Sequence, residues 1–138
     1  LLITNWRCDS VEVLRVRFRN GGSSLTGASD YRYACRNQND GNTTSDATST
    51  GDSSFRLQAR NYPDQIIENA LVEIDFAITA NRYRPIMARG GGWNGNAEVA
   101  NETMGGAFVN SGTVDGIEIF PGGGNIVDGI FSLYGMSK

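Results

Sequence analysis

The stretch from Thr113 to Gly135, TVDGIEIFPGGGNIVDGIFSLYG, places two apolar runs around a glycine-rich turn. Apolar residues recur at a period of two in both runs, which is typical of half-buried strands. The turn between them, PGGGN, predicts a β-hairpin with a long or bulged connection. Pro121 cannot donate a hydrogen bond to a neighbouring strand, so pairing is expected to stop there. In the second run the alternation places Val127, Phe131 and Leu133 on one face.

Similar short alternating runs occupy most of the remaining chain. The pattern predicts further strands over residues 11–19, 31–36, 55–60, 69–79 and 83–89, separated by turn-forming residues. About eight short strands with regular turn signals, and no helix of ordinary length, predict an all-β antiparallel sandwich or barrel. The 138 residues have the length of one domain and no linker divides them, so residues 1–138 are expected to form a single unit.

Two polar segments lack this alternation and are predicted to be surface loops. Residues 37–54 are rich in Asn, Asp, Gly, Ser and Thr, and residues 90–95 have the sequence GGGWNG. The segment from residue 97 to 109 favours two strands around a turn at Gly105 and Gly106. We expect any recognition function to lie in the two loops.

The composition excludes several classes of chemistry. The chain contains no histidine, so it has neither a Ser-His-Asp nor a Cys-His triad and lacks the usual general base near neutral pH. Two cysteines are too few thiolates for a structural zinc site. The net charge of −3 argues against nucleic-acid binding, and no apolar run has the length of a membrane span or a signal peptide. We therefore expect no catalytic residues, no metal, no cofactor, and no nucleic-acid or membrane partner.

Cys8 and Cys35 lie on separate predicted strands. They can form a disulfide only if the strands bring them to the required distance. Two buried thiols are the favoured alternative, because a chain of this size can fold without a covalent link.

The closing segment resembles a C-terminal signature of virion proteins of tailed bacteriophages. Residues 124–135, GNIVDGIFSLYG, are similar to the pattern G-N-I-x-x-G-x-x-x-L-Y-G, and residues 114–121, VDGIEIFP, are similar to the strand that precedes it. The blocks GGSS at 21–24 and GASDYRYA at 27–34 also fit, so the resemblance extends over most of the chain.

This resemblance implies a jelly-roll sandwich that is a non-enzymatic structural protein. The expected location is the surface of a phage particle, as a head decoration (cement) or a tail-associated subunit. The expected partners are other copies of the chain, a trimer being one option, and other virion proteins. The resemblance supplies no catalytic residues.

Trp93 and Asn94, in the 90–95 segment, are the candidate binding residues. An indole offers a flat apolar face and one donor, which suit a host-surface sugar or a protein partner. The alternative is that Trp93 folds back and caps the sandwich. The binding interpretation leads to an alternative function, a receptor-binding module of a tail fibre or spike. A polysaccharide-degrading enzyme is less favoured, since histidine is absent and no pair of carboxylates stands out.

Arg15, Arg17 and Arg19 alternate with apolar residues and form a positive stripe on one predicted strand face. One interpretation is an interface with an acidic surface or with a neighbouring copy. The other is a solvated sheet face in which cross-strand ion pairs contribute little stability. Arg56 and Arg60 are expected near the stripe if their strand pairs with it.

Overall fold

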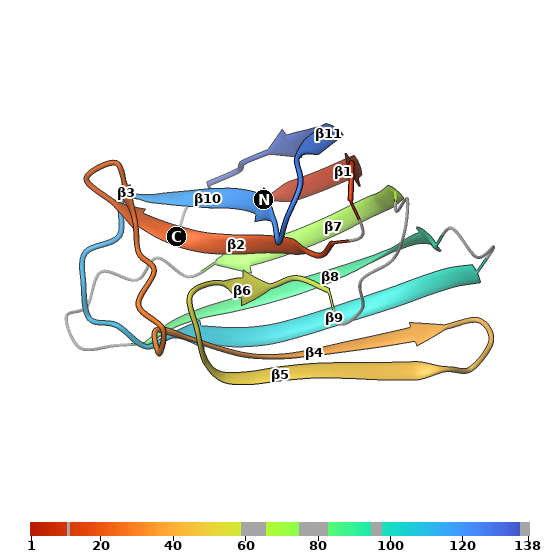
Figure 1. The fold of residues 1–138 in the computed structure, drawn as a ribbon, viewed down its shortest axis with the longest axis horizontal. Coiled ribbons are helices and arrows are strands. Elements are labelled where there is room, and N and C mark those ends of the chain that lie inside the picture. The colour runs from red at the N-terminus through yellow and green to blue at the C-terminus, as the bar shows by residue number, and fades with distance from the viewer. Residues whose placement is uncertain (11, 59–65, 75–82, 95–97, 136–138) are drawn as a thin grey trace.

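Eleven strands in two antiparallel sheets make up the described part of the chain (Figure 1). The computed structural model describes residues 1–10, 12–58, 66–74, 83–94 and 98–135. The large sheet contains, in spatial order, β11 (Ile126–Ser132), β1 (Leu2–Cys8), β7 (Ile66–Ile74), β8 (Arg84–Asn94), β9 (Glu98–Phe108), β4 (Tyr31–Asn39) and β5 (Thr44–Asp52). The small sheet contains β10 (Gly116–Pro121), β2 (Leu14–Asn20) and β3 (Ser23–Ser24), with β6 (Phe55–Arg56) also paired to β2.

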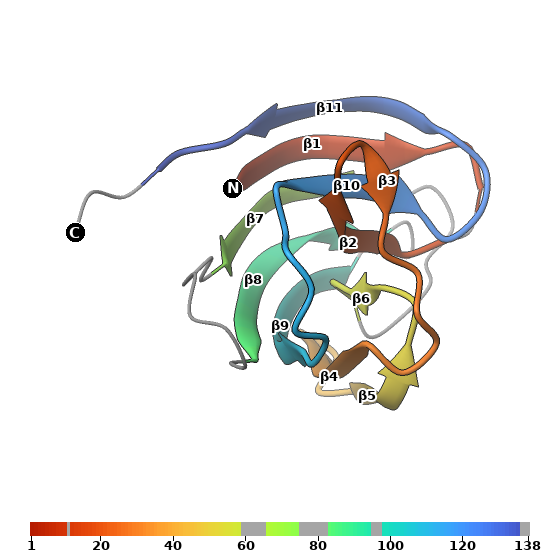
Figure 2. The ribbon, with the colours of Figure 1, turned by 90° about the vertical axis from the view of Figure 1, so that its left-hand side faces the viewer.

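The two sheets face each other, and the large sheet curves around the small one (Figure 2). The core between them contains an aromatic cluster of Phe18, Tyr31, Phe55 and Phe108, all fully buried. Ring centroids are 5.0 Å apart for Phe18 and Phe108 and 4.9 Å apart for Tyr31 and Phe55. The all-β antiparallel sandwich is therefore confirmed. Over the described residues, no helix has the length and apolar character needed to cross a membrane.

The jelly-roll arrangement is not confirmed. A jelly roll has eight strands in two Greek keys, whereas the described residues form sheets of seven and four strands. The strand number also exceeds the expected eight, partly because β3 lies among turn-forming residues and β5 lies in a segment predicted as a loop. The strand predicted over residues 55–60 is present as the two-residue β6, and residues 59 and 60 lie outside the described part of the chain.

The predicted C-terminal hairpin is wrong, although both of its strands exist. β10 pairs with β2 in the small sheet, and β11 pairs with β1 in the large sheet. The connection PGGGN therefore crosses from one sheet to the other, as does the connection between β1 and β2. Two backbone hydrogen bonds join these two connections to each other. Gly122 N donates to Val13 O at 3.0 Å, and Asp9 N donates to Asn125 O at 3.1 Å. The last pair of β10 joins Pro121 to Leu14, so pairing does end at the proline.

The expected common face of Val127, Phe131 and Leu133 is also wrong. Phe131 packs against the core together with Ile126, whereas Val127 and Leu133 are exposed. Register shifts between β1 and β11 break the alternation, so residues five apart share the inner face.

Both predicted loops are strands over most of their length. Residues 37–54 contain the end of β4 and all of β5, with a turn between Asn39 and Thr44. Residues 90–94 are the end of β8, and β9 runs through Gly105 and Gly106 without a turn. Gly95 lies outside the described residues. The pattern failed in β5 because nearly all of its residues are polar and none is fully buried, although Ala47 packs against the core.

The predicted faces of β2 and β4 are confirmed. Leu14, Val16 and Phe18 are fully buried, and the arginines between them face outward. In β4, Tyr31 and Cys35 are buried and Tyr33 is half-buried against the core, whereas Arg32, Ala34 and Arg36 are exposed. Local alternation was sufficient here because each strand has one face on the core.

Candidate interfaces on the two sheets

The backbone of Trp93 and Asn94 lies at the end of β8. There Trp93 pairs with Val99 and Asn94 pairs with Glu98 of β9. The side chains of Trp93 and Asn94 lie outside the described part of the structure. Their binding role stays a prediction, but their place in the fold is the end of a strand pair.

The β4–β5 turn lies beside this end of the large sheet (Figure 1). Asp40 N donates a hydrogen bond to Val99 O at 3.0 Å. Within the turn, Thr43 N donates to Asn39 Oδ1 at 2.7 Å, and Asn42 adopts a φ of 58°. The two segments that were expected to carry recognition are thus neighbours in space.

The arginine stripe lies on the outer face of the small sheet. Arg17 pairs with Glu118 across β2 and β10, with distances of 2.6 Å from Nε to Oε2 and 3.1 Å from Nη2 to Oε1. The hydrogen bonds from Arg17, and a further one from Ser24, lower the pKa of Glu118 to about 2. The same pair raises the pKa of Arg17. The Arg17 guanidinium also lies 4.3 Å from the centroid of the Phe120 ring.

The other two arginines of the stripe also make contacts within the chain. Arg15 Nη1 is 3.5 Å from Asp52 Oδ2 and donates to Ser54 Oγ at 3.1 Å. Arg19 Nη2 donates to the Gly22 carbonyl, while its Nε is buried without a hydrogen-bond partner among the described residues.

Arg56 is aligned with Arg15 across β6 and β2, as expected, whereas Arg60 lies outside the described residues. The stripe therefore shows the cross-strand ion pair of the structural alternative. Whether a partner also contacts it stays a prediction.

A second surface, on β11, was not singled out from the sequence. Among the side chains that the structure describes, seven large apolar ones are mostly exposed, and four of these lie within eight residues: Val127 (53% exposed), Ile130 (60%), Leu133 (67%) and Tyr134 (68%). Half-buried Leu2 of β1 and Leu71 of β7 pair with each other next to this strand. β11 ends the strand order, so within the described structure its outer side has no neighbouring strand. We call residues 126–134 the C-terminal edge.

One signal for this edge was available in the sequence. Apolar residues occur on both faces of the run 126–134, which also contains no Lys, Arg or Pro. A strand at the margin of a sheet normally carries such residues as protection against pairing. What the sequence did not reveal was that β11 is at the margin.

Several residues of the C-terminal motif have a structural role. Asn125 donates from its backbone N and from Nδ2 to the Asp9 carboxylate, at 2.7 and 3.0 Å, and these bonds lower the pKa of Asp9. Gly124 has a φ of 67°, and a Cβ there would collide with the Asp9 and Ser10 side chains. At Gly129, with a φ of 153°, a Cβ would lie 2.8 Å from the Phe131 ring. Gly124, Asn125 and Gly129 are therefore explained by this fold.

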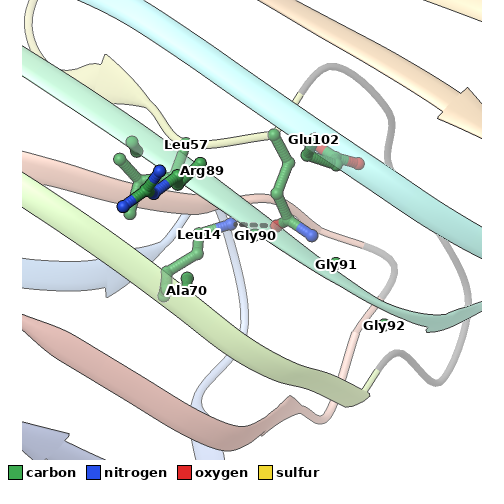
Figure 3. A pocket seen from close by; sticks show the side chains of 10 residues that line it. Leu14, Leu57, Ala70, Arg89, Gly90, Gly91, Gly92 and Glu102 are labelled. Carbon is green, nitrogen blue, oxygen red and sulfur yellow. Dashed lines mark hydrogen bonds between the residues drawn. The ribbon is translucent and has the colours of Figure 1, made fainter.

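A small cavity lies between the sheets, beside the glycines of β8 (Figure 3). Its volume is about 20 Å³, enough for one water molecule. Gln58 and Glu102 are its main polar lining, and Gln58 Oε1 accepts a hydrogen bond from Leu14 N at 2.8 Å. Glu102 is buried and accepts a hydrogen bond from Asn37 Nδ2 at 3.0 Å. The cavity suits a structural water rather than a substrate.

Both cysteines are buried free thiols, as the favoured alternative predicted. Cys35 Sγ donates to the Arg56 carbonyl at 2.9 Å, and burial raises its pKa to about 12. Such a thiol is unreactive at neutral pH. Nowhere in the described ranges do three or more Cys, Asp or Glu side chains gather in a way that could hold a metal ion.

Comparison with known proteins adds no family to this picture. No protein-family model, no curated protein and no solved structure matches the chain. The resemblance of residues 124–135 to virion proteins thus stays a prediction, and function is argued below from the surfaces of the sandwich.

Proposed function

We propose that the protein is a non-enzymatic structural subunit of a tailed-phage virion. It is exposed on the particle surface, as a head decoration or a tail-associated protein. The observation that carries this proposal is the exposure of the C-terminal motif. Its Leu133 and Tyr134 directly follow β11, which ends at Ser132, and are 67% and 68% exposed.

The residues of the C-terminal motif fall into two groups, one needed for the fold of this chain and one exposed on its surface. Gly124, Asn125 and Gly129 are required by turns and close approaches within this chain. Leu133 and Tyr134 have no such role, because each exposes most of its side chain. Large apolar groups that gather on a surface are typical of contact with another protein. A subunit that is repeated in an assembly supplies that contact.

The interior supports the same proposal. An aromatic cluster joins the two sheets, and a separate cavity between them has room for one water. A sandwich with this interior suits a module whose function lies in its outer surfaces.

Quantitative mass spectrometry of purified phage particles tests the proposal. We expect the chain to remain with particles after washing in high salt and to be present in a fixed copy number. Deletion of its gene should make the particles more sensitive to heat or should remove a surface feature. Absence of the chain from purified particles would contradict the proposal.

Receptor binding is a second candidate function, favoured by one observation. The β4–β5 turn and the end of β8 that carries Trp93 and Asn94 are adjacent, joined by the hydrogen bond from Asp40 to Val99. Together they form one end of the large sheet that could face a host-surface sugar. Binding to a glycan array that is lost in Trp93→Ala would support this function. Tyr83→Ala is the matched control, since Tyr83 is an exposed aromatic residue outside this end. Equal binding by wild type and Trp93→Ala would exclude the role of Trp93.

A further inference from the structure

We propose that the C-terminal edge pairs with the same edge of a second copy. The two β11 strands run antiparallel across a two-fold axis at Ile130 and join two seven-stranded sheets into one. This inference rests on the proposed function, because it identifies the neighbour that a structural subunit would contact.

The two margins of the large sheet differ in how they are protected. β5, at one margin, has the sequence TSDATSTGD with two carboxylates and no buried residue. β11, at the other margin, has one charged residue, Asp128, and exposes Val127 and Ile130. Charged or polar edges prevent pairing between molecules, and apolar edges without such residues promote it. The structure therefore favours β11 as the margin that pairs.

The sequence of β11 is self-complementary in one antiparallel register. The pairing of β11 with β1 places Ile130 opposite Thr4 and Ser132 opposite Leu2, so both face away from the core. With the two-fold axis at Ile130, this residue meets its own copy on the outer face. Asp128 then faces Ser132 of the partner subunit, whose hydroxyl can donate to the carboxylate. Val127 faces Leu133 of the partner subunit, which completes two symmetric apolar contacts.

Neighbouring registers are poorer. An axis at Asp128 would place two carboxylates opposite each other, which is destabilising. An axis at Gly129 would place Asp128 opposite Ile130 of the partner subunit and Val127 opposite Phe131 of the partner subunit. The second of these pairs joins an exposed residue to one that faces its own core. Charge and side-chain direction thus favour the axis at Ile130 over the axes at Asp128 and Gly129.

The exposed tail gives an independent reason for a partner. Residues 133–135 continue past β11 and leave the body of the sandwich (Figure 2). In the proposed register, Leu133 lies beside Val127 of the partner subunit, and both side chains are exposed in the single chain. The second copy then covers the Leu133 side chain.

Sedimentation velocity of the purified chain tests this interface. We expect a concentration-dependent dimer for wild type. Ile130→Arg should weaken association by about a hundredfold or more, because two guanidinium groups would meet at the axis. Met87→Arg is the matched control, since Met87 is 61% exposed and lies on β8 in the same sheet. A wild-type monomer at about 100 µM, or equal association by Ile130→Arg and Met87→Arg, would overturn the proposal.

A disulfide tests the register. Ile130→Cys should form a covalent dimer in mild oxidant, since residues opposite each other in an antiparallel pair have Cβ atoms at about the distance a disulfide needs. Met87→Cys should not, and the native thiols are both buried. A stable dimer without the Ile130→Cys cross-link would overturn the two-fold register. A wild-type monomer that is nevertheless a fixed component of particles would contradict this inference and leave the structural function intact.

Discussion

Arg17 and Glu118 show how a charged stripe can be a structural feature of a sheet. The two side chains form a bidentate pair across β2 and β10, and the guanidinium also covers the Phe120 ring. Bidentate geometry makes this pair stronger than an ordinary surface ion pair. The sequence predicted the positive stripe correctly, but Glu118 became its partner only because β10 pairs with β2.

The ion pair between Arg17 and Glu118 should make the free energy of unfolding depend on pH. The pKa of Glu118 is lowered to about 2 in the folded chain, compared with about 4.3 in an unfolded chain. A lowered pKa means that the folded state binds the proton less readily. The stabilisation is therefore complete above the unfolded value and is lost as pH falls toward the folded value.

We predict that Glu118→Gln makes the loss of stability between about pH 5 and pH 2 shallower. Urea unfolding at pH 7, 4 and 3 measures the free energy of unfolding for both proteins. Glu73→Gln, at an exposed carboxylate on the large sheet, is the control and should follow wild type. Parallel curves for wild type and Glu118→Gln would contradict the role of the pair.

Among the strands, the alternation of apolar and polar residues predicted where most strands lie but not which strands pair with each other. β2 and β4 have one face on the core, so their pattern predicted both their existence and their inner residues. β5 has only polar residues and Ala47 on its half-buried face and was therefore predicted as a loop. β10 and β11 were assigned to one hairpin, because a sequence pattern contains no information about which sheet a strand joins. The same limit hid the C-terminal edge, since only the strand order reveals a margin.

Substitutions at Gly105 and Gly106 test which face of β9 packs against the rest of the chain. A Cβ at Gly106 would lie 2.7 Å from the Arg32 carbonyl oxygen and 3.0 Å from the Phe55 ring, whereas a Cβ at Gly105 would meet nothing within 4 Å. We predict that Gly106→Ala destabilises the fold by about 1–3 kcal/mol. Gly105→Ala should be neutral or stabilising by up to about 1 kcal/mol. Thermal or urea unfolding distinguishes them, and equal stability of the two variants would show that β9 does not run straight through this site.

At the scale of the whole molecule, the sandwich depends on contacts between its sheets. Phe18 of the small sheet packs against Phe108 and Tyr31 of the large sheet. The Tyr31 hydroxyl also accepts a hydrogen bond from Phe18 N at 2.9 Å and donates one to Leu25 O at 2.7 Å. These contacts link the sheets through both apolar and polar groups.

We predict that Phe18→Ala lowers the free energy of unfolding by about 3–5 kcal/mol. Tyr83→Ala, at an exposed aromatic residue, should change it by less than about 0.5 kcal/mol. Circular dichroism during urea unfolding provides both values. A small effect of Phe18→Ala would mean that the sheets are not held together at this cluster.

The described part of the molecule offers three surfaces with different properties. The arginine stripe is engaged in contacts within the chain, the β4–β5 turn is polar, and the C-terminal edge is apolar and unpaired in the described structure. An assembly through the C-terminal edge leaves the other two surfaces available for further partners. This division of surfaces is compatible with the structural subunit that we propose.

Electron cryomicroscopy of the whole phage particle shows whether the protein is a surface subunit of the virion. We predict density for this two-sheet sandwich on the particle surface, with the C-terminal edge against a neighbouring subunit and Leu133 and Tyr134 covered. Intact particles without that density would contradict the account.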